Sequence, residues 1–303
     1  MRLAVLLAGL SLALCGLPGW AAAPAPLRFL LSFDDGPSAA PGPDNPTEQV
    51  LRTLANNPIQ PGIKAIFFVQ TRNSRAGASA RGKALMRRQV DEGHSLAFHT
   101  ATVGHSSHRR MAPPELAQTL ADGVADLQAL GGAAPRFVRP PGWAYNAATL
   151  AAYQQAGLQM LLTDLTATDG KIVWPNYSPR RRSHLRHQLR LLAQAPERLP
   201  EVEGVRPVLV TFHDPNPFTA AHLEEYLQIL LEESEAVGLL VDVAQPFYAE
   251  RTELERAASA RAVTRAEPLQ HVATTWSSWP ETLFGILRRS RTVPPLLQTE
   301  HPP

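Results

Sequence analysis

The chain has 303 residues, of which 44% are hydrophobic and 18% are charged, so it holds enough apolar material for one large core or two modest ones. Its 29 basic and 27 acidic residues leave a formal charge of +2, and no run of like charge is long enough to favour a nucleic-acid partner. A disordered chain and a nucleic-acid-binding protein are therefore both disfavoured.

The first 23 residues have the pattern of a secretory signal peptide. One Arg precedes an apolar stretch over residues 3–14, and the segment ends on small residues at 21–23, as signals do before their cleavage site. Gly16 and Pro18 interrupt the apolar run, which is too short for the roughly 20 residues that a bilayer requires. We therefore expect a secreted or periplasmic protein with no stable membrane span after signal cleavage.

Cys15 is the only cysteine in the chain, and it lies within this signal. Leu14 precedes it, where a lipid-attachment site favours a small residue, so a lipoprotein is the less favoured interpretation. Cleavage would leave a mature chain without a thiol, which excludes a disulfide and a Cys-rich zinc site. Any metal would have to be held by His and carboxylate side chains.

From residue 27 onward, short apolar runs alternate with stretches of helical periodicity, which predicts an α/β fold with a mostly parallel sheet. The expected strands are residues 27–33, 65–69, 94–98, 136–138, 158–163, 207–212 and 239–243. The expected helices are residues 47–55, 83–92, 115–130, 147–156 and 221–235. Periodicity leaves open whether the sheet stays open or closes as a barrel.

The alternation lapses in the middle of the chain, so we expect one catalytic domain over residues 24–248 with an insertion at about 170–205. Residues 180–190 of this segment, RRRSHLRHQLR, are strongly basic. A solvated helix face is favoured over a surface that contacts glycan or an anionic polymer, since charge runs are usually exposed. Residues 249–303 are expected to form a helical and proline-containing C-terminal tail.

Polar residues suited to chemistry cluster where the expected strands end. They are Asp34, Asp35, His99, Arg139, Asp164, His213 and Asp214. In parallel α/β folds, the carboxyl ends of the strands form one face, where loops meet and ligands bind. Residues far apart in the sequence are thus expected to share a single site.

The segment SFDDGP leads an apolar strand directly into two adjacent carboxylates, Asp34 and Asp35. Two such charges repel each other, so their side chains must point in different directions unless a cation compensates them. One carboxylate could then bind a metal while the other acts as a base. A simple Asp-Gly-Pro turn with helix-capping roles is an equally good interpretation of the dipeptide in isolation.

Three His residues lie within ten positions in HTATVGHSSH, namely His99, His105 and His108. With Asp35 they offer two neutral imidazoles and one carboxylate, the ligand set of a catalytic zinc site that keeps positions open for water and substrate. A single His at a strand end is more often a satisfied polar residue than a ligand. The cluster favours a metal site.

In five ordered motifs the chain resembles the polysaccharide deacetylases of carbohydrate esterase family 4, which have the NodB homology domain. The motifs are SFDDGP, EGHSLAFHT after the strand KAIFFV, RPPGWAYN, DLTATDG and VLVTFHD, within residues 27–243. The resemblance implies a distorted (β/α) barrel as a single catalytic domain. It also implies a hydrolase that uses Zn²⁺, or another divalent cation such as Co²⁺, on an acetylated polysaccharide or oligosaccharide.

The resemblance also assigns roles to individual residues. In the first motif, Asp34 would be the general base and Asp35 a metal ligand. His99 would be the first His ligand, Arg139 would position the base, and His213 would be the general acid. This set suits hydrolysis of an acetyl group by an activated water.

The second His ligand of the family normally lies four residues after the first, but this chain has Val103 at that position. A two-residue insertion before His105 brings the following segment, HSSHRRMAPPEL, into register with the family. His105 is therefore the expected second ligand. His108 would fall at an apolar family position and is the reserve candidate.

Two further motifs depart from the family pattern. After the prolines the chain has Gly142 and then Trp143, where the family has an aromatic residue and then Gly. The Gly142 amide remains the expected oxyanion donor, with Trp143 beside the substrate. The fourth motif lacks its usual Trp, and either Asp164 or Asp169 could hold the second ring nitrogen of His213.

The expected reaction is removal of N-acetyl groups of the GlcNAc type from peptidoglycan, chitin-like oligomers or exopolysaccharide. The main alternative is an O-acetyl esterase of the xylan type on the same metal site, since the chemistry at the carbonyl is shared. A catalytically inactive carbohydrate-binding homologue is the alternative from another class, raised by the departures from the family motifs. Retention of both carboxylates, Arg139 and His213 argues against it.

Overall fold

The computed structural model describes residues 24–170 and 180–265. The expected signal peptide, residues 1–23, lies outside this part of the chain, as do residues 171–179 and the end of the expected tail, residues 266–303. None of the described helices is both long enough and apolar enough to span a membrane.

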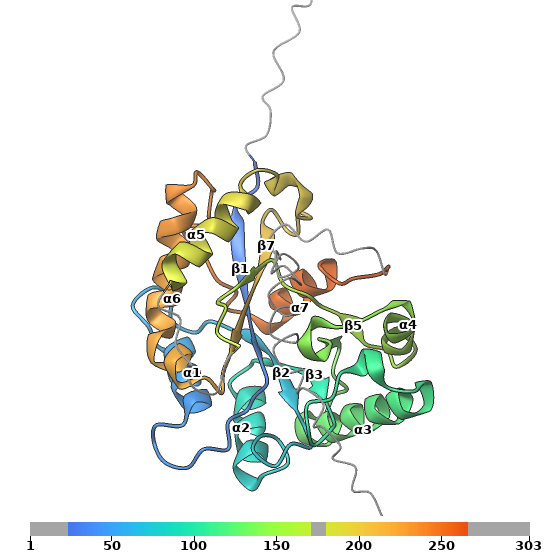
Figure 1. The fold of residues 1–303 in the computed structure, drawn as a ribbon. Coiled ribbons are helices and arrows are strands. Elements are labelled where there is room, and N and C mark those ends of the chain that lie inside the picture. Colours follow the sequence, from blue (N-terminus) through green and yellow to red (C-terminus); the bar gives the residue numbers. More distant parts are fainter. Residues whose placement is uncertain (1–23, 171–179, 266–303) are drawn as a thin grey trace, which may run out of the picture.

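A parallel sheet of seven strands, in the spatial order β5-β4-β3-β2-β1-β7-β6, curls into a distorted half-barrel at the centre of the described chain (Figure 1). The strands are β1 (Leu27–Asp34), β2 (Ala65–Gln70), β3 (Ser95–Thr100), β4 (Phe137–Val138), β5 (Gln159–Met160), β6 (Leu165–Thr166) and β7 (Arg206–His213). β2 and β3 are buried over their whole length and β1 nearly so, because helices cover parallel sheets. The predicted distorted barrel is confirmed.

Helices surround the outer face of the curled sheet (Figure 1). They are α1 (Pro46–Ala55), α2 (Ala80–Asp91), α3 (Pro113–Gly131), α4 (Ala147–Gln155), α5 (Arg181–Leu192) and α6 (Pro217–Ala236). A further helix, α7 (Arg251–Ala260), packs against the inner face instead. Asn45, Asn146 and Asn216 cap α1, α4 and α6 by accepting backbone N–H groups of the first turn, as Asn does at helix starts. These caps fix where the chain turns from the site into each helix.

The inner face of the barrel changes from apolar to polar along the strands. At the amino end, the inner residues form an apolar cluster with α7, which includes Leu30, Ile66, Phe68, Ala97, Phe137, Leu209, Leu254, Ala257 and Ala258. Side chains of a strand alternate between faces, so the next inner positions toward the carboxyl end are polar. Asp34, His99, Arg139 and His213 occupy those positions, which places them on one side of the barrel.

The two edge strands, β5 and β6, are joined directly by residues 161–164. The amide of Leu161 donates to the carbonyl of Val138 on one edge (2.9 Å), and the amide of Asp164 donates to the carbonyl of Leu209 on the other (3.0 Å). This connection therefore ties the two sides of the half-barrel together.

Two elements of the sheet differ from the sequence-based expectation. Residues 239–243 form no strand but a single parallel bridge between Val241 and Leu27, because Leu240 and Val243 are exposed. The sequence does not predict β6, since two residues give no periodic signal. Within residues 170–205, α5 connects β6 to β7 as a crossover helix. Beyond residue 248, where a helical stretch is expected, α7 packs against the inner apolar cluster.

A substitution at Gly123 on α3 tests how tightly this helix packs against β3 behind the site. A Cβ at Gly123 would lie 2.0 Å from the ring of Phe98, so we expect Gly123→Ala to lower the free energy of unfolding by about 1–2 kcal/mol, since overpacking outweighs the gain in helix propensity. At Gly131 the added Cβ would meet only Val90, at 3.5 Å. Urea unfolding should show no decrease in the free energy of unfolding for Gly131→Ala. Equal stability of the two variants would contradict this account of the packing.

Candidate functional site

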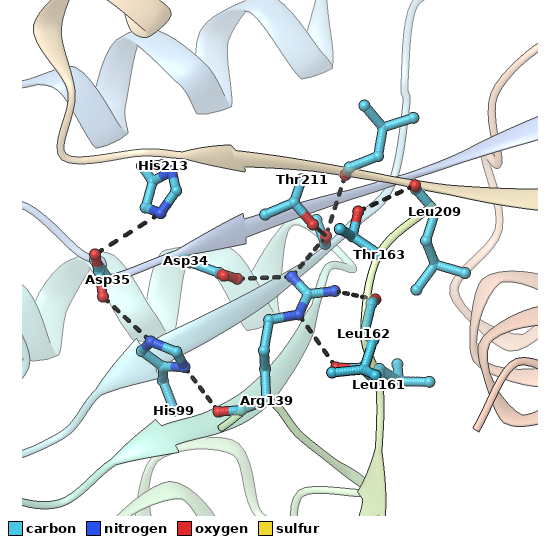
Figure 2. A network of polar contacts seen from close by, with 12 residues as sticks. Asp34, Asp35, His99, Arg139, Leu161, Leu162, Thr163, Leu209, Thr211 and His213 are labelled. Carbon is cyan, nitrogen blue, oxygen red and sulfur yellow. Dashed lines mark hydrogen bonds and ion pairs between the residues drawn. The ribbon is translucent and has the colours of Figure 1, made fainter. Parts of the chain in front are cut away.

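The candidate site lies at the carboxyl ends of the strands, where the inner side chains are polar. β1 supplies Asp34 and leads into Asp35, β3 supplies His99, β4 leads into Arg139, and β7 ends at His213. Figure 2 shows these five side chains converging from four strands. The structure thus brings together residues that are up to 179 positions apart in the chain.

Arg139 is fully buried and holds the carboxylate of Asp34. Its Nη1 donates to Asp34 Oδ1 (2.7 Å) and to Ser32 Oγ (2.9 Å). Its other nitrogens donate to the carbonyls of Leu162 (2.9 Å) and Leu161 (3.3 Å), and its guanidinium lies 4.0 Å from the ring centre of Phe68. A charge-assisted pair of this kind fixes the orientation of the Asp34 carboxylate.

Asp35 points away from Asp34, toward two imidazoles. Its φ of +70° is in the left-handed region, which turns its side chain out of the alternation of β1. Asp35 Oδ1 lies 3.2 Å from His99 Nε2 and 3.0 Å from His105 Nε2, and the two imidazole nitrogens lie 3.0 Å apart. Burial alone would raise the pKa of the Asp35 carboxyl, but hydrogen bonds with His105 and His99 hold it well below its usual range.

These three atoms fit a divalent cation. A tetrahedral ion with ligand distances of 2.0–2.1 Å separates neighbouring ligand atoms by roughly 3.3 Å, which is close to the separations in this triangle. His99 Nδ1 lies 2.9 Å from the carbonyl of Arg139, so Nδ1 carries the proton and leaves the lone pair of Nε2 facing the triangle. Within residues 24–170 and 180–265, Asp35, His99 and His105 are the one group of this kind that could hold a metal ion.

His108, the reserve candidate, lies outside this triangle. Its ring is fully buried, stacks on Phe98 with ring centres 5.7 Å apart, and places Nδ1 2.9 Å from the hydroxyl of Tyr153. Burial lowers the pKa of His108 to about 3, so it packs as a neutral core residue. The structure therefore favours His105 as the second His of the cluster.

His213 is held by Asp169. Its Nδ1 lies 2.8 Å from Asp169 Oδ1, and its backbone amide donates to Asp169 Oδ2 (2.9 Å). Burial alone would lower the pKa of His213, but the charge and hydrogen bond of Asp169 raise it to about 9. Its Nε2 lies 3.9 Å from Asp35 Oδ2, so it faces the candidate metal site.

Asp164, the other candidate partner of His213, lies elsewhere. Its Oδ2 accepts from the amide of Leu209 (2.9 Å), and its Oδ1 pairs with Arg261. Both partners stabilise the connection between the barrel edges. Of the two carboxylates left open by the sequence, Asp169 contacts His213 and Asp164 does not.

Gly142 and Trp143 lie in the short 3-10 helix η2 (Pro141–Trp143), on the Arg139 side of the site. Both have positive φ, +62° and +61°, and the amide of Trp143 donates to the carbonyl of Pro140 (3.0 Å). The Trp143 ring centre lies 5.0 Å from the guanidinium carbon of Arg139. Trp143 thus covers Arg139, and its own amide is already engaged with the backbone.

Several supporting residues had no assigned role in the sequence analysis. Thr219 Oγ1 donates to Asp169 Oδ2 (2.6 Å), and Asn216 Nδ2 donates to the carbonyl of Asp169 (2.7 Å). Both lie in the segment NPFT, where an Asn followed by Pro predicts the start of a helix. That signal places α6 but does not reveal which carboxylate its first turn contacts.

Asp214 is a fully buried carboxyl next to the site. Its Oδ2 accepts from Thr47 Oγ1 (2.6 Å), and its Oδ1 has no hydrogen-bond partner among the described residues. A Cβ on Gly36 would lie 2.1 Å from Oδ1, so this position requires glycine. Burial raises the pKa of Asp214 to about 7, against the opposing effect of Thr47.

This raised pKa predicts a pH-dependent stability. In the unfolded chain Asp214 ionises near pH 4, but in the folded protein it retains its proton to about pH 7. Ionisation of Asp214 therefore lowers the free energy of unfolding, and this loss of stability grows as pH rises from about 4 to 7. Below pH 4 the loss is absent, because the carboxyl is protonated in both states. Asp214→Asn should gain thermal stability relative to wild type across this window; a constant difference in Tm from pH 4 to 8 would contradict the assignment.

Comparison with known proteins gives one family. A family model described as polysaccharide deacetylase matches residues 24–161. A chitin deacetylase of Pestalotiopsis sp is 26% identical over 144 residues, which are 48% of this chain and 44% of that protein. The match therefore spans less than half of that relative.

Solved structures agree with this family. A family 4 acetyl xylan esterase from Clostridium thermocellum, in complex with a cobalt ion, is 25% identical with a TM-score of 0.50, over 76% of this chain and 90% of that one. The chitin deacetylase from Colletotrichum lindemuthianum has the same fold at 21% identity, with a TM-score of 0.52 over 71% and 84% of the two chains. The chain therefore contains a polysaccharide deacetylase domain of the NodB type, the domain of carbohydrate esterase family 4.

Proposed function

We propose that this protein is an exported, metal-dependent deacetylase that removes N-acetyl groups of the GlcNAc type from a polysaccharide. Peptidoglycan, chitin-like oligomers and exopolysaccharide are the candidate substrates. The observation that carries the proposal is the donor triangle of Asp35, His99 and His105. Beside this triangle lie Asp34, which is held by Arg139, and His213, which is held by Asp169. Export rests on the signal-like pattern of residues 1–23.

Asp35, His99 and His105 would hold the divalent cation, Zn²⁺ or Co²⁺. When bound, the cation supplies Lewis acidity, which polarises the acetyl carbonyl and makes a water easier to deprotonate. The three residues contribute two neutral imidazoles and one carboxylate, which suits such an ion and keeps further coordination positions free.

Asp34 is the proposed general base. Arg139 neutralises and orients its carboxylate at 2.7 Å, so one oxygen is fixed and the group is ready to accept a proton from the attacking water. The water oxygen then bonds to the carbonyl carbon. The Gly142 amide is the proposed donor to the developing oxyanion, an interaction that is generally worth about 3–4 kcal/mol of transition-state stabilisation.

His213 is the proposed general acid. Because Asp169 raises its pKa to about 9, the imidazole is protonated at neutral pH, with Nε2 directed toward the candidate metal site. It can donate this proton to the sugar nitrogen as the C–N bond breaks, which gives acetate and a free amine. The proton taken by Asp34 then passes to solvent and His213 is protonated again, which closes the cycle.

An O-acetyl esterase is the second candidate, favoured by the likeness to the acetyl xylan esterase. Both reactions pass through the same attack on an acetyl carbonyl. Acetate release from chitooligosaccharides, peptidoglycan fragments and acetylated xylan distinguishes them. We expect release from the N-acetylated glycans, its loss with a chelator, and its return on addition of Zn²⁺ or Co²⁺. Glycan binding without acetate release in metal-loaded protein would instead identify an inactive carbohydrate-binding homologue.

The proposed base, Asp34, can be separated experimentally from the metal ligands. Asp34→Asn should retain metal binding but lower kcat by about 10²- to 10⁴-fold, because only the proton acceptor is lost. His99→Ala should lose both metal and activity, because a donor atom is removed. Metal content and acetate release are measured on both variants, with thermal unfolding as the control for folding. Equal metal loss in the two variants would refute this division of roles.

A further prediction concerns Asp169, the partner of His213. Asp169→Asn removes the charge that keeps the imidazole protonated, so kcat should fall and the alkaline limb of the pH–rate profile, expected near pH 9 in wild type, should move to lower pH. Asp164→Asn is the matched control, since Asp164 contacts Leu209 and Arg261 instead. An alkaline limb that is unchanged in Asp169→Asn would contradict the role of this residue.

A further inference from the structure

Strand β2 lies between the two strands that carry the candidate metal ligands. β1 leads into Asp35, β3 carries His99, and β2 pairs with both. The last residue of β2, Gln70, follows a register shift between β2 and β3. Bulges of this kind re-aim a side chain and recur next to active sites. The direction of the Gln70 side chain is therefore set by this irregularity at the end of β2.

The backbone at the end of β2 joins the two ligand-bearing segments. The amide of Gln70 donates to the carbonyl of Gly36, the residue after Asp35 (2.9 Å). The amide of Thr71 donates to the carbonyl of Thr100, the residue after His99 (3.0 Å). The spacing between the Asp35 segment and the His99 segment therefore depends on where β2 ends.

The side chain of Gln70 contacts Asp35 directly and is nearly buried, with 6% of its surface exposed. Its Nε2 donates to the carbonyl of Asp35 (3.0 Å) and lies 3.4 Å from Asp35 Oδ1. Oδ1 is the same oxygen that faces both imidazoles. Gln70 thus contacts both the backbone and the donor atom of the candidate ligand.

Asn73 fixes which way the Gln70 amide points. Asn73 Nδ2 donates to Gln70 Oε1 (3.0 Å), and an oxygen that accepts this bond leaves the NH₂ group directed at Asp35. Asp35 itself has a φ of +70°, a conformation that an aspartate adopts only where surrounding contacts hold it. The chain Asn73–Gln70–Asp35 supplies such contacts.

We propose that Gln70 is a positioning residue of the metal site, which holds the Asp35 carboxylate in the orientation that the cation requires. The inference rests on the metal site of the proposed function and adds to it a residue beyond the ligand set. Partners that hydrogen-bond to a ligating carboxylate orient it, and their loss typically weakens metal binding by 10–100-fold. Gln70→Met should therefore weaken metal binding while it preserves the volume of the side chain.

The chain offers a matched control at Gln60. Its amide also bonds the backbone, since Nε2 donates to the carbonyl of Phe247 (2.8 Å) and Oε1 accepts from the amide of Phe247 (2.9 Å). Phe247 pairs with Phe29 in β1, at the end of the barrel away from the candidate site. Gln60→Met therefore removes comparable hydrogen bonds without affecting the ligands.

The experiment is titration of the metal-free full-length protein with Co²⁺, followed by the visible absorption of the bound ion. We expect Gln70→Met to raise the Kd for Co²⁺ by about 10–100-fold, with Gln60→Met equal to wild type and a changed absorption spectrum only for Gln70→Met. A Kd for Gln70→Met that equals that of Gln60→Met would overturn the proposal. Asn73→Ala, which leaves the Gln70 amide free to turn, should raise the Kd by a smaller factor.

Three further outcomes test the role of Gln70 and the metal site itself. If Gln70→Met does not fold, as judged by thermal unfolding of the metal-free protein, Asn73→Ala takes its place, and a wild-type Kd in that variant would overturn the proposal. If wild type itself binds no Co²⁺, the metal site of the proposed function fails together with this inference. Co²⁺ binding that is equally tight in wild type, Gln70→Met and Asn73→Ala would leave the metal site intact and refute the role of Gln70 alone.

Discussion

The guanidinium of Arg139 lies inside the barrel, where an unpaired charge would be strongly destabilising. Asp34 and Ser32 on β1 accept from it, and so do the carbonyls of residues 161 and 162 in the connection between the barrel edges. Its own carbonyl lies 2.9 Å from Nδ1 of His99. One residue therefore links the proposed base, a candidate metal ligand and the segment that joins the two sides of the sheet, so the site and the closure of the fold depend on the same contacts.

Around this centre, each of the other key side chains is held by a neighbour from a different element. The first turn of α6 contacts Asp169, which holds His213. Gln70 at the end of β2 contacts Asp35. Functional groups need such support, because small errors in orientation are costly for metal binding and catalysis. The polar end of the barrel is thus organised by the ends of its own strands and helices.

Much of this arrangement can be predicted from the sequence, because the long strands are apolar over most of their length and end in polar residues. The polar residues that follow these apolar runs indicate that Asp34, His99 and His213 are neighbours. The α/β barrel follows from the alternation of strands and helices together with the family motifs. Short elements such as β6 give no periodic signal, and the apolar run at 239–243 lies at the surface with one bridge.

The remaining differences concern choices that only three-dimensional contacts decide. His105 and His108 are three residues apart and chemically identical, but one faces Asp35 and the other stacks on Phe98. Asp164 and Asp169 are both acids near the end of a strand, but only the second lies against His213. Gln70 belongs to no motif, since its contact with Asp35 depends on a register shift in the sheet.

The central claim is that one divalent cation binds where the side chains of Asp35, His99 and His105 converge. Anomalous diffraction from crystals soaked in Zn²⁺, measured on both sides of the zinc absorption edge, tests it most directly. The account predicts a single strong peak at about 2.0–2.2 Å from Asp35 Oδ1, His99 Nε2 and His105 Nε2. A strong peak at other residues, or no peak at saturating Zn²⁺, would contradict it.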